Sequence, residues 1–439
     1  MSIFTKGNRA STIEAVRLAA RALEARSGSG SVFLEERTDI VLTIGRDVPR
    51  TLAITPSRGA TIGDDERSIH VADPTLEELV SLGRGGAEPS SHAAHNDADE
   101  VDLDDIHRYE RTLRETIESG IVGYGDVQWT ASVIAFNQNV WVSDRDGTVT
   151  TDRRKSCRTE LKLRIGHASD RVAVADHVHA PNDDALPPGR VRVMLDRLDR
   201  RRPARRVPSG ATGAVFAAGV GGLLVHELVG HALEGDVLGR QSTWLVHELP
   251  KSGRPFRVED DPRRGRAAWA NDDEGVSSRS VLLTDGNRVA GCLLDRAAAA
   301  ARSTSSTGHG RRATFRDPVR PRMGCTFIHA GDDDPAAIIA ETDSGVFVRR
   351  MTAGHVDPVR GLASFVVSDA DLIERGRCVV PVEPFVIDVR GAEMWSTLDR
   401  VGADLVFDAC VGSCVRDGQP LAVSVGAPTI RIGVITVNC

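Results

Sequence analysis

Two histidines and a glutamate lie close together near the middle of the chain, in the order His226-Glu227-Leu228-Val229-Gly230-His231. Neutral imidazoles are common zinc ligands, and a neighbouring carboxylate can accept a proton from a water molecule that the metal activates. The spacing differs from the familiar H-E-x-x-H motif, because one additional residue separates the histidines. These residue types predict a metal site that cleaves a bond with water.

The spacing of the two histidines has a geometric consequence. In a regular α-helix, side chains five positions apart point about 140° away from each other, whereas side chains four apart differ by about 40°. Two imidazoles can then meet at one ion only if the helix widens locally, as it does in a π-bulge. Gly230 precedes His231 and is the residue that best tolerates a distorted backbone. The sequence therefore predicts an irregular turn between Glu227 and His231.

Two histidines do not complete a metal site, so a third protein ligand is needed. Cys414 lies in a glycine-rich turn over residues 411–419, where small neighbours would let a thiolate approach an ion closely. Cys410, four residues earlier, is the alternative, and the spacing alone does not separate the two thiols.

The composition indicates which classes of protein are excluded. The chain has 439 residues, 41% of them hydrophobic and 27% charged, which is typical of a water-soluble globular protein with two domains or more. The formal net charge is −7, which argues against a general nucleic-acid binder.

The cysteines and the apolar segments predict a cytoplasmic protein. The 7 cysteines are scattered without a C-x-x-C pair, so neither a disulfide scaffold nor a redox site is expected. The first residues lack the apolar core of a secretory signal, and the most apolar stretch, residues 211–225, is too short for a membrane span.

The periodicity of apolar residues predicts an α+β protein, with helices and strands in both halves. Helices are expected over residues 12–26, 74–84, 108–119, 222–233 and 392–401. Strands are expected over residues 31–35, 40–44, 132–136, 139–142, 213–218, 281–284, 361–368 and 379–387.

A cluster of arginines and prolines at residues 197–208 predicts an exposed linker and a domain boundary. The expected N-terminal α/β domain, residues 1–205, carries a mixed or antiparallel sheet. The expected C-terminal domain, residues 206–439, is strand-rich and carries the metal-site helix. The acidic stretch 89–105 is expected to be a solvated loop.

Several motifs resemble, in order, those of the TldD/PmbA family of metallopeptidases. The histidine motif is followed by Ala-Leu-Glu-Gly-Asp at 232–236, which resembles the tail of the family's H-E-x-x-x-H helix. Asp-Asp-Glu-Gly at 272–275, Gly-His-Gly-Arg-Arg at 308–312 and Pro-Arg-Met at 321–323 are also similar, with His309 in place of the usual asparagine. The segment 412–429 resembles the family's C-terminal cysteine loop, and the first 200 residues match only loosely.

The resemblance implies a function and a set of site residues. It implies a zinc-dependent peptidase, with iron(II) as the alternative metal, that hydrolyses unstructured or small peptides. It assigns the metal to His226, His231 and Cys414, and Glu227 is then the general base. Substrate-binding candidates are Arg311 and Arg312, which would hold a peptide carboxylate or pair with acids such as Asp272, together with His309. We expect His309 to be a loop histidine rather than a fourth metal ligand.

The resemblance also implies a partner, and it leaves alternatives open. Because both histidines are present, the chain resembles the catalytic TldD-type subunit, and a dimer is implied, either with a PmbA-like chain or with a second copy. The segment 244–257 departs from the glycine-rich family pattern, which leaves substrate choice open. The alternatives are a dedicated protease that removes the leader of a modified peptide, and a non-catalytic subunit that binds peptides.

Overall fold

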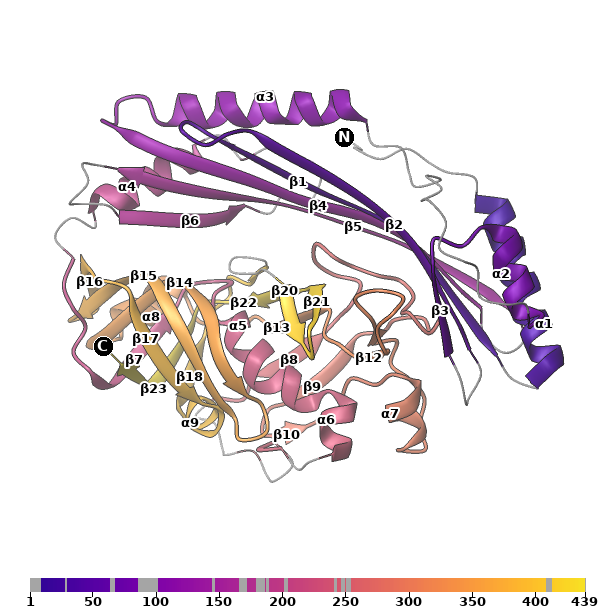
Figure 1. Ribbon diagram of the computed structural model, residues 1–439. Helices are drawn as coiled ribbons and strands as arrows, with labels where there is room; N and C mark the ends of the chain where they lie inside the picture. Colours follow the sequence, from indigo (N-terminus) through magenta and orange to yellow (C-terminus); the bar gives the residue numbers. More distant parts are fainter. Residues whose placement is uncertain are drawn as a thin grey trace.

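The structure is a computed structural model, shown in Figure 1. It describes residues 9–27, 30–63, 68–85, 102–143, 147–165, 172–178, 186, 189–200, 204–240, 243–245, 249, 254–407 and 413–438. Within these residues, no helix is long and apolar enough to cross a membrane. Cys410 and most of the acidic segment 89–105 lie outside the described residues.

The first half of the chain forms one long, antiparallel, six-stranded sheet, in the order β3-β2-β1-β4-β5-β6. Figure 1 shows this sheet spanning the rest of the molecule. Its strands are β1 (Ser31–Gly45), β2 (Thr51–Gly63), β3 (Ser68–Ala72), β4 (Val127–Ser143), β5 (Val149–Ile165) and β6 (Val172–Val178).

Two apolar clusters attach helices to one face of this sheet. Side chains alternate between the two faces of a strand, and the buried apolar residues of β1 all have even numbers along this face, namely Val32, Leu34, Ile40, Leu42 and Ile44. They pack at one end against α1 (Arg9–Ser27) and α2 (Leu76–Gly83), and at the other against α3 (Leu103–Gly120) and α4 (Arg190–Arg200).

The opposite face of the sheet is polar and contacts the second half of the chain. Glu35 on β1 accepts a hydrogen bond from the main-chain N–H of Phe315 (2.7 Å). Arg154 on β5 is buried and donates to Asp273 (2.6 Å). A buried guanidinium needs its countercharge close by, so this ion pair fixes the sheet against the loop that bears Asp273.

The expected separation of two strands, at residues 31–35 and 40–44, is wrong, because both belong to the single strand β1. Residues 35–39 are polar, yet they pair in register with β2 and β4, and Glu35, Arg37 and Asp39 present their side chains to the polar face. The same holds for residues 132–142, which form part of the single strand β4. One face of such a strand is polar because it contacts another part of the protein. In the sequence, the polar residues of that face look like the end of one strand and the start of the next.

The second half contains a closed five-stranded barrel. Strands β14 (Ser344–Asp357), β7 (Gly210–Phe216), β23 (Ile430–Asn438), β17 (Phe385–Arg390) and β15 (Leu362–Glu374) pair in this order, and β15 pairs again with β14. Strands β16 (Arg377–Pro381) and β18 (Leu398–Val401) pair with β15 and β23, and α8 (Pro335–Ala340) precedes β14.

A second, mixed sheet lies beside the barrel. Its order is β10 (Arg288–Val289), β9 (Val281–Asp285), β8 (Arg257–Asp260), β13 (Cys325–Ile328), β22 (Ser424–Ala427) and β19 (Val406–Phe407). Two short hairpins complete the half, β11 (Gly310–Arg311) with β12 (Arg320–Pro321), and β20 (Ser413–Arg416) with β21 (Gln419–Ala422). Helix α7 (Arg296–Ala300) lies between β10 and β11 in the chain.

Two expected elements of the second half differ from the structure. Residues 379–387 form two strands, β16 and β17, because Pro381 and Pro384 cannot donate to a continuous ladder. The expected helix 392–401 ends early, since α9 covers Gly391–Thr397 and the remaining residues pair with β23 as β18.

The predicted metal-site helix lies between the barrel and the mixed sheet. Its apolar side chains pack against those of the barrel and of the mixed sheet in one apolar cluster. Leu224, Leu228 and Leu233 of the helix have at most 1% of their surface exposed. A helix that is apolar on all sides is buried on all sides, which explains the continuous apolar run in the sequence. Its polar residues are therefore held in a rigid, nearly dry environment.

Candidate metal centre

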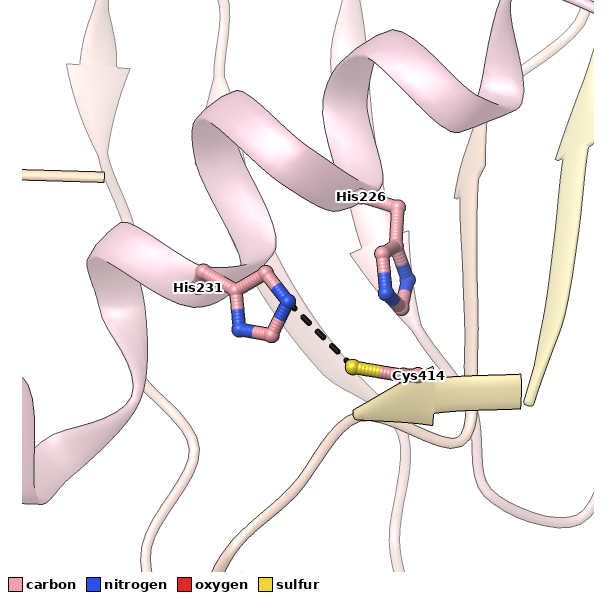
Figure 2. A group of neighbouring side chains, drawn as sticks. All are labelled: His226, His231 and Cys414. Carbon is pink, nitrogen blue, oxygen red and sulfur yellow. Dashed lines mark hydrogen bonds between the residues drawn. The ribbon is translucent and has the colours of Figure 1, made fainter. Parts of the chain in front are cut away.

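The buried helix changes its winding at the histidine motif. It begins as α5 (Gly222–Val225), widens into a π-helical turn over His226–Gly230, and tightens into a 3-10 turn over His231–Leu233. The main-chain N–H of His231 donates to the carbonyl of His226, five residues earlier. The predicted irregular turn is confirmed, and it brings both imidazoles to one side of the helix (Figure 2).

The role expected for Gly230 is wrong. Its backbone has ordinary helical angles (φ −58°, ψ −57°), so it uses none of the special freedom of glycine. An ideal Cβ at this position would instead lie 2.0 Å from the Sδ atom of Met323. Gly230 is required because Met323, itself buried, packs directly against the helix backbone.

We expect Gly230→Ala to lower the free energy of unfolding by about 1–3 kcal/mol, the usual cost of overpacking a core. Gly239→Ala is the matched control, because a Cβ there meets no atom within 4 Å. Urea unfolding followed by circular dichroism measures both. Equal stability of the two variants would contradict the packing role of Gly230.

The helix and a distant hairpin bring three candidate ligands together. The Nε2 atom of His231 lies 3.3 Å from the Sγ atom of Cys414 on β20, and one donor atom from each of His226, His231 and Cys414 lies within 4.8 Å of the other two. The two imidazole rings are 5.2 Å apart at an interplanar angle of 80°. Figure 2 shows all three side chains directed toward one point.

The donor set and its electrostatics fit a soft divalent cation. Two imidazoles and a thiolate are a common zinc set, with bonds of about 2.0–2.3 Å. Burial alone would raise the pKa of Cys414, but His231 and His226 hold that pKa well below the usual range of a thiol. Burial likewise opposes charge on His231, whereas Cys414 and Glu234 raise the pKa of His231 well above its usual value. The cluster thus favours a thiolate beside positive charge.

Glu227 lies beside this cluster. Its Oε2 atom is 3.6 Å from the Nε2 atom of His231, and 13% of its side chain is exposed. It therefore lies next to the three donors without being completely buried. This is the position that a proton acceptor needs.

A buried acid fixes the orientation of His231. The Nδ1 atom of His231 donates to Glu234 (3.1 Å), which leaves Nε2 directed at Cys414. Glu234 is fully buried and also accepts from Arg416 (2.7 Å), which forms two further hydrogen bonds with Asp236. A carboxylate behind a ligating histidine fixes its tautomer and raises its basicity.

Arg322 holds the hairpin that carries the thiol. Its side chain is 1% exposed and donates to the main-chain carbonyls of Cys414 (2.9 Å) and Gln419 (3.1 Å), one on each strand of the β20–β21 hairpin. The clamp fixes where Cys414 lies relative to the helix, which is far away in the sequence.

The divergent segment 244–257 supports the helix as well. The indole N–H of Trp244 donates to the main-chain carbonyl of Leu228, inside the π-helical turn (2.9 Å). The Trp244 ring packs so close to Gly361 and Gly391 that a Cβ at either would lie within 2.6 Å of it. Residues 246–248 and 250–253 of this segment lie outside the described residues.

The three substrate-binding candidates lie apart from the metal cluster. His309 is fully buried, with ring nitrogens bonded to Asp260 (3.2 Å) and Thr307 (2.8 Å), so it presents no surface to a ligand. The Arg311 side chain pairs with Asp273 (3.2 Å) rather than with Asp272. Arg312 lies over the ring of Phe33 on the sheet, 4.4 Å from its centre. Binding of substrate by these arginines stays a prediction.

Sequence reasoning gave no role to the residues that support the site. Glu234, Arg416 and Arg322 all occur within the matched motifs. One signal was available: Glu234 follows His231 by three residues, a spacing that brings side chains together on a helix. No local pattern connects His231 with Arg416 or Cys414 with Arg322, because these contacts join separate parts of the chain.

The sequence is similar to a family of metallopeptidase domains and to proteins named metalloproteases. Residues 209–439 match the family described as PmbA/TldA metallopeptidase C-terminal domain. A protein named metalloprotease TldD homolog from Haemophilus influenzae is 35% identical over 326 residues, which cover 70% of this chain and 67% of that protein. A protein of the same name from Buchnera aphidicola is 31% identical, over 56% of this chain and about half (51%) of its own length.

Solved structures share the fold. TldE from Thermococcus kodakarensis superposes with a TM-score of 0.73, covers 98% of this chain and all (100%) of its own, and is 15% identical. A structure titled a putative modulator of a DNA gyrase, from Thermotoga maritima, has a TM-score of 0.70 and 14% identity, and covers 97% of this chain and 100% of its own. With a family match over more than half of its length, the chain belongs to the TldD/PmbA family of metallopeptidases.

Proposed function

We propose that this chain is a zinc-dependent peptidase that hydrolyses unstructured or small peptides. The observation that carries the proposal is the convergence of His226, His231 and Cys414, whose donor atoms lie within 4.8 Å of one another. Relatives named metalloproteases support the reaction class. One relative, from Saccharolobus solfataricus, is named a zinc metalloprotease, which supports zinc over iron(II).

Each residue has a proposed role in hydrolysis. The two imidazoles and the thiolate hold the ion, which when bound supplies Lewis acidity toward a peptide carbonyl and lowers the pKa of water. Glu227 accepts the proton of the attacking water at its carboxylate, 3.6 Å from His231, and later delivers it to the leaving amine. Glu234, Arg416 and Arg322 keep the ligands in position.

A chelator experiment tests the reaction class. The full chain, loaded with zinc, is incubated with a mixture of unstructured peptides, and the products are followed by mass spectrometry. We expect cleavage that stops with a chelator and returns when zinc is restored. Peptides that stay bound but uncut with zinc present would identify the chain as a non-catalytic peptide-binding subunit instead.

A second experiment tests the proposed positioning by Glu234. Because Glu234→Gln keeps the shape of the side chain but removes the charge behind His231, we expect zinc affinity to fall about 10–100-fold, as for other residues that orient metal ligands. A competition titration with a chromogenic chelator measures it. Glu383→Gln, at an exposed ion pair with Arg206, is the control and should bind zinc as the parent does.

The organisation of the whole protein is also a proposal. We propose an N-terminal TldD/PmbA-like domain over residues 1–205 and a metallopeptidase domain over residues 206–439, which is supported by the confinement of the long sheet to the first half. Pairing with a PmbA-like chain or a second copy is proposed from the family resemblance. A dedicated leader-peptide protease has the same chemistry and differs only in its substrate.

A further inference from the structure

A cavity of about 240 Å³ lies between the polar face of the long sheet and the hairpin that carries Cys414. Ser413, Pro420 and Leu421 line it on the hairpin side. Figure 1 shows β20 and β21 directly beneath the long strands of the sheet. Leu421 lies directly opposite Cys414 in the β20–β21 pairing, so the cavity borders the residue pair that contains the proposed metal ligand.

Arginines predominate in the walls of this cavity, although Arg154 also pairs with Asp152 and Arg158 with Glu160. Among the described residues around it, one acid, Asp39, faces a set of arginines from both halves of the chain: Arg37, Arg154, Arg158, Arg266 and Arg311. We call this space the arginine cavity. Guanidinium groups gathered in a partly dry space create a positive potential that favours an anion.

The arginines are not all neutralised by the protein. Arg154 is fully engaged, with hydrogen bonds to Asp152, Asp273 and the carbonyl of Asn271. Arg311 shares Asp273 through its Nε atom, and its two terminal nitrogens donate no hydrogen bond to any described residue. Burial, and then the charge of Arg154, lower the pKa of Arg311 to about 10. Asp273 is therefore shared by two guanidinium groups, and Asp152 is a second carboxylate for Arg154 alone among these hydrogen bonds.

The guanidinium groups of Arg37 and Arg311 both lie over aromatic rings. The guanidinium of Arg37 lies 4.3 Å from the centre of the Phe136 ring, and that of Arg311 lies 4.3 Å from the centre of the Trp269 ring. Arg37 binds Asp39 through Nε and Nη2 (both 2.7 Å), while its Nη1 has no hydrogen-bond acceptor among the described residues. Guanidinium groups that lie over rings and keep spare donors are pre-organised for a carboxylate.

We propose that the arginine cavity binds a carboxylate of the peptide substrate, either its C-terminal carboxylate or an acidic side chain. This proposal rests on the proposed peptidase function. A carboxylate held at the hairpin end of the cavity, beside Leu421, places the neighbouring peptide bonds near Cys414, because Leu421 pairs with Cys414 and successive residues are about 3.8 Å apart. The cavity admits one terminal residue or one side chain, so it selects a chemical group while the remainder of the peptide is free to vary.

Peptide binding to the full chain in the Glu227→Ala background, loaded with zinc, tests this proposal. Fluorescence anisotropy compares four labelled unstructured peptides: a free C-terminal acid, its amide, and amides with one internal glutamate or glutamine. We expect one carboxylate peptide to bind about tenfold more tightly than its neutral counterpart, the usual effect of a charged hydrogen bond. The acid–amide pair and the glutamate–glutamine pair distinguish the two sources of the carboxylate.

Two variants locate the preference in the cavity. Arg37→Gln and Arg311→Met should each reduce the carboxylate preference to less than about twofold, because each removes one charged donor. Arg17→Gln breaks a surface ion pair with Glu14 outside the cavity and should keep the preference. If Arg311→Met does not fold, Arg37→Gln decides, since the Arg37 side chain is 25% exposed and its loss is tolerated more easily.

The outcomes separate this proposal from the proposed function. Equal binding of carboxylate and neutral peptides, or a preference that survives Arg37→Gln, overturns the carboxylate site. Cleavage of peptides by the unmodified chain is measured separately. A carboxylate preference without any cleavage would keep the site and reject the peptidase, whereas cleavage without a preference would do the reverse.

Discussion

Replacing Glu227 by alanine is expected to abolish peptide hydrolysis while zinc stays bound. Glu227 belongs to the same turn as His226 but is not one of the three converging donors, and its carboxylate lies 3.6 Å from His231 with 13% of the side chain exposed. Loss of a general base lowers turnover by about 10²–10⁴-fold. Turnover of an unstructured peptide and zinc content by atomic emission measure the two effects.

A matched glutamate shows whether the effect is specific. Glu393 is exposed near the beginning of α9, so Glu393→Ala should hydrolyse peptide at the parent rate. Glu227→Gln is a useful second variant, because it keeps the size of the side chain and removes only its basicity. Normal turnover by either Glu227 variant would refute the assignment of the base.

Replacing Cys414 by serine is expected to remove most of the bound zinc, and hydrolysis with it. Cys414 supplies the only sulfur in the described cluster, and its thiolate is stabilised by His231 and His226 despite burial. A serine hydroxyl stays protonated at neutral pH and is a poor zinc ligand, so we expect a loss of affinity of at least about 100-fold. Zinc titration of the purified variant measures it.

Two other thiols serve as controls for Cys414. Cys378 is exposed on β16, and Cys378→Ser should bind zinc as the parent does. Cys410→Ser tests the alternative that the sequence left open, and it should also keep its zinc. If Cys410→Ser loses the metal and Cys414→Ser retains it, the third ligand has been assigned to the wrong residue.

The helices were predicted better than the long strands, for a physical reason. Helices α1 and α2 follow from local periodicity, because one face of each packs on the sheet. The sequence pattern divides strand β1 in two, because Glu35, Arg37 and Asp39 are polar. They face the second half of the chain, and a sequence pattern does not reveal that a polar face is covered.

The sequence by itself determined the chemistry on the helix. The five-residue spacing of His226 and His231 required a widened turn, and a π-helical turn is present, because that geometry depends only on local backbone winding. The sequence also contains the residue types of a metal-dependent hydrolase, namely two imidazoles and an adjacent carboxylate. These residue types alone predict that class of enzyme.

Only the tertiary structure decided how the rest of the site is assembled. Cys414 reaches His231 because Arg322 clamps its hairpin, Glu234 orients His231 because Arg416 shares its charge, and the arginine cavity exists because the sheet of the first half lies over that hairpin. These contacts join residues that are far apart in the chain, up to 183 positions for His231 and Cys414. Local periodicity carries no information about contacts between residues so far apart in the sequence. These contacts form only when the barrel and the mixed sheet pack around the buried helix.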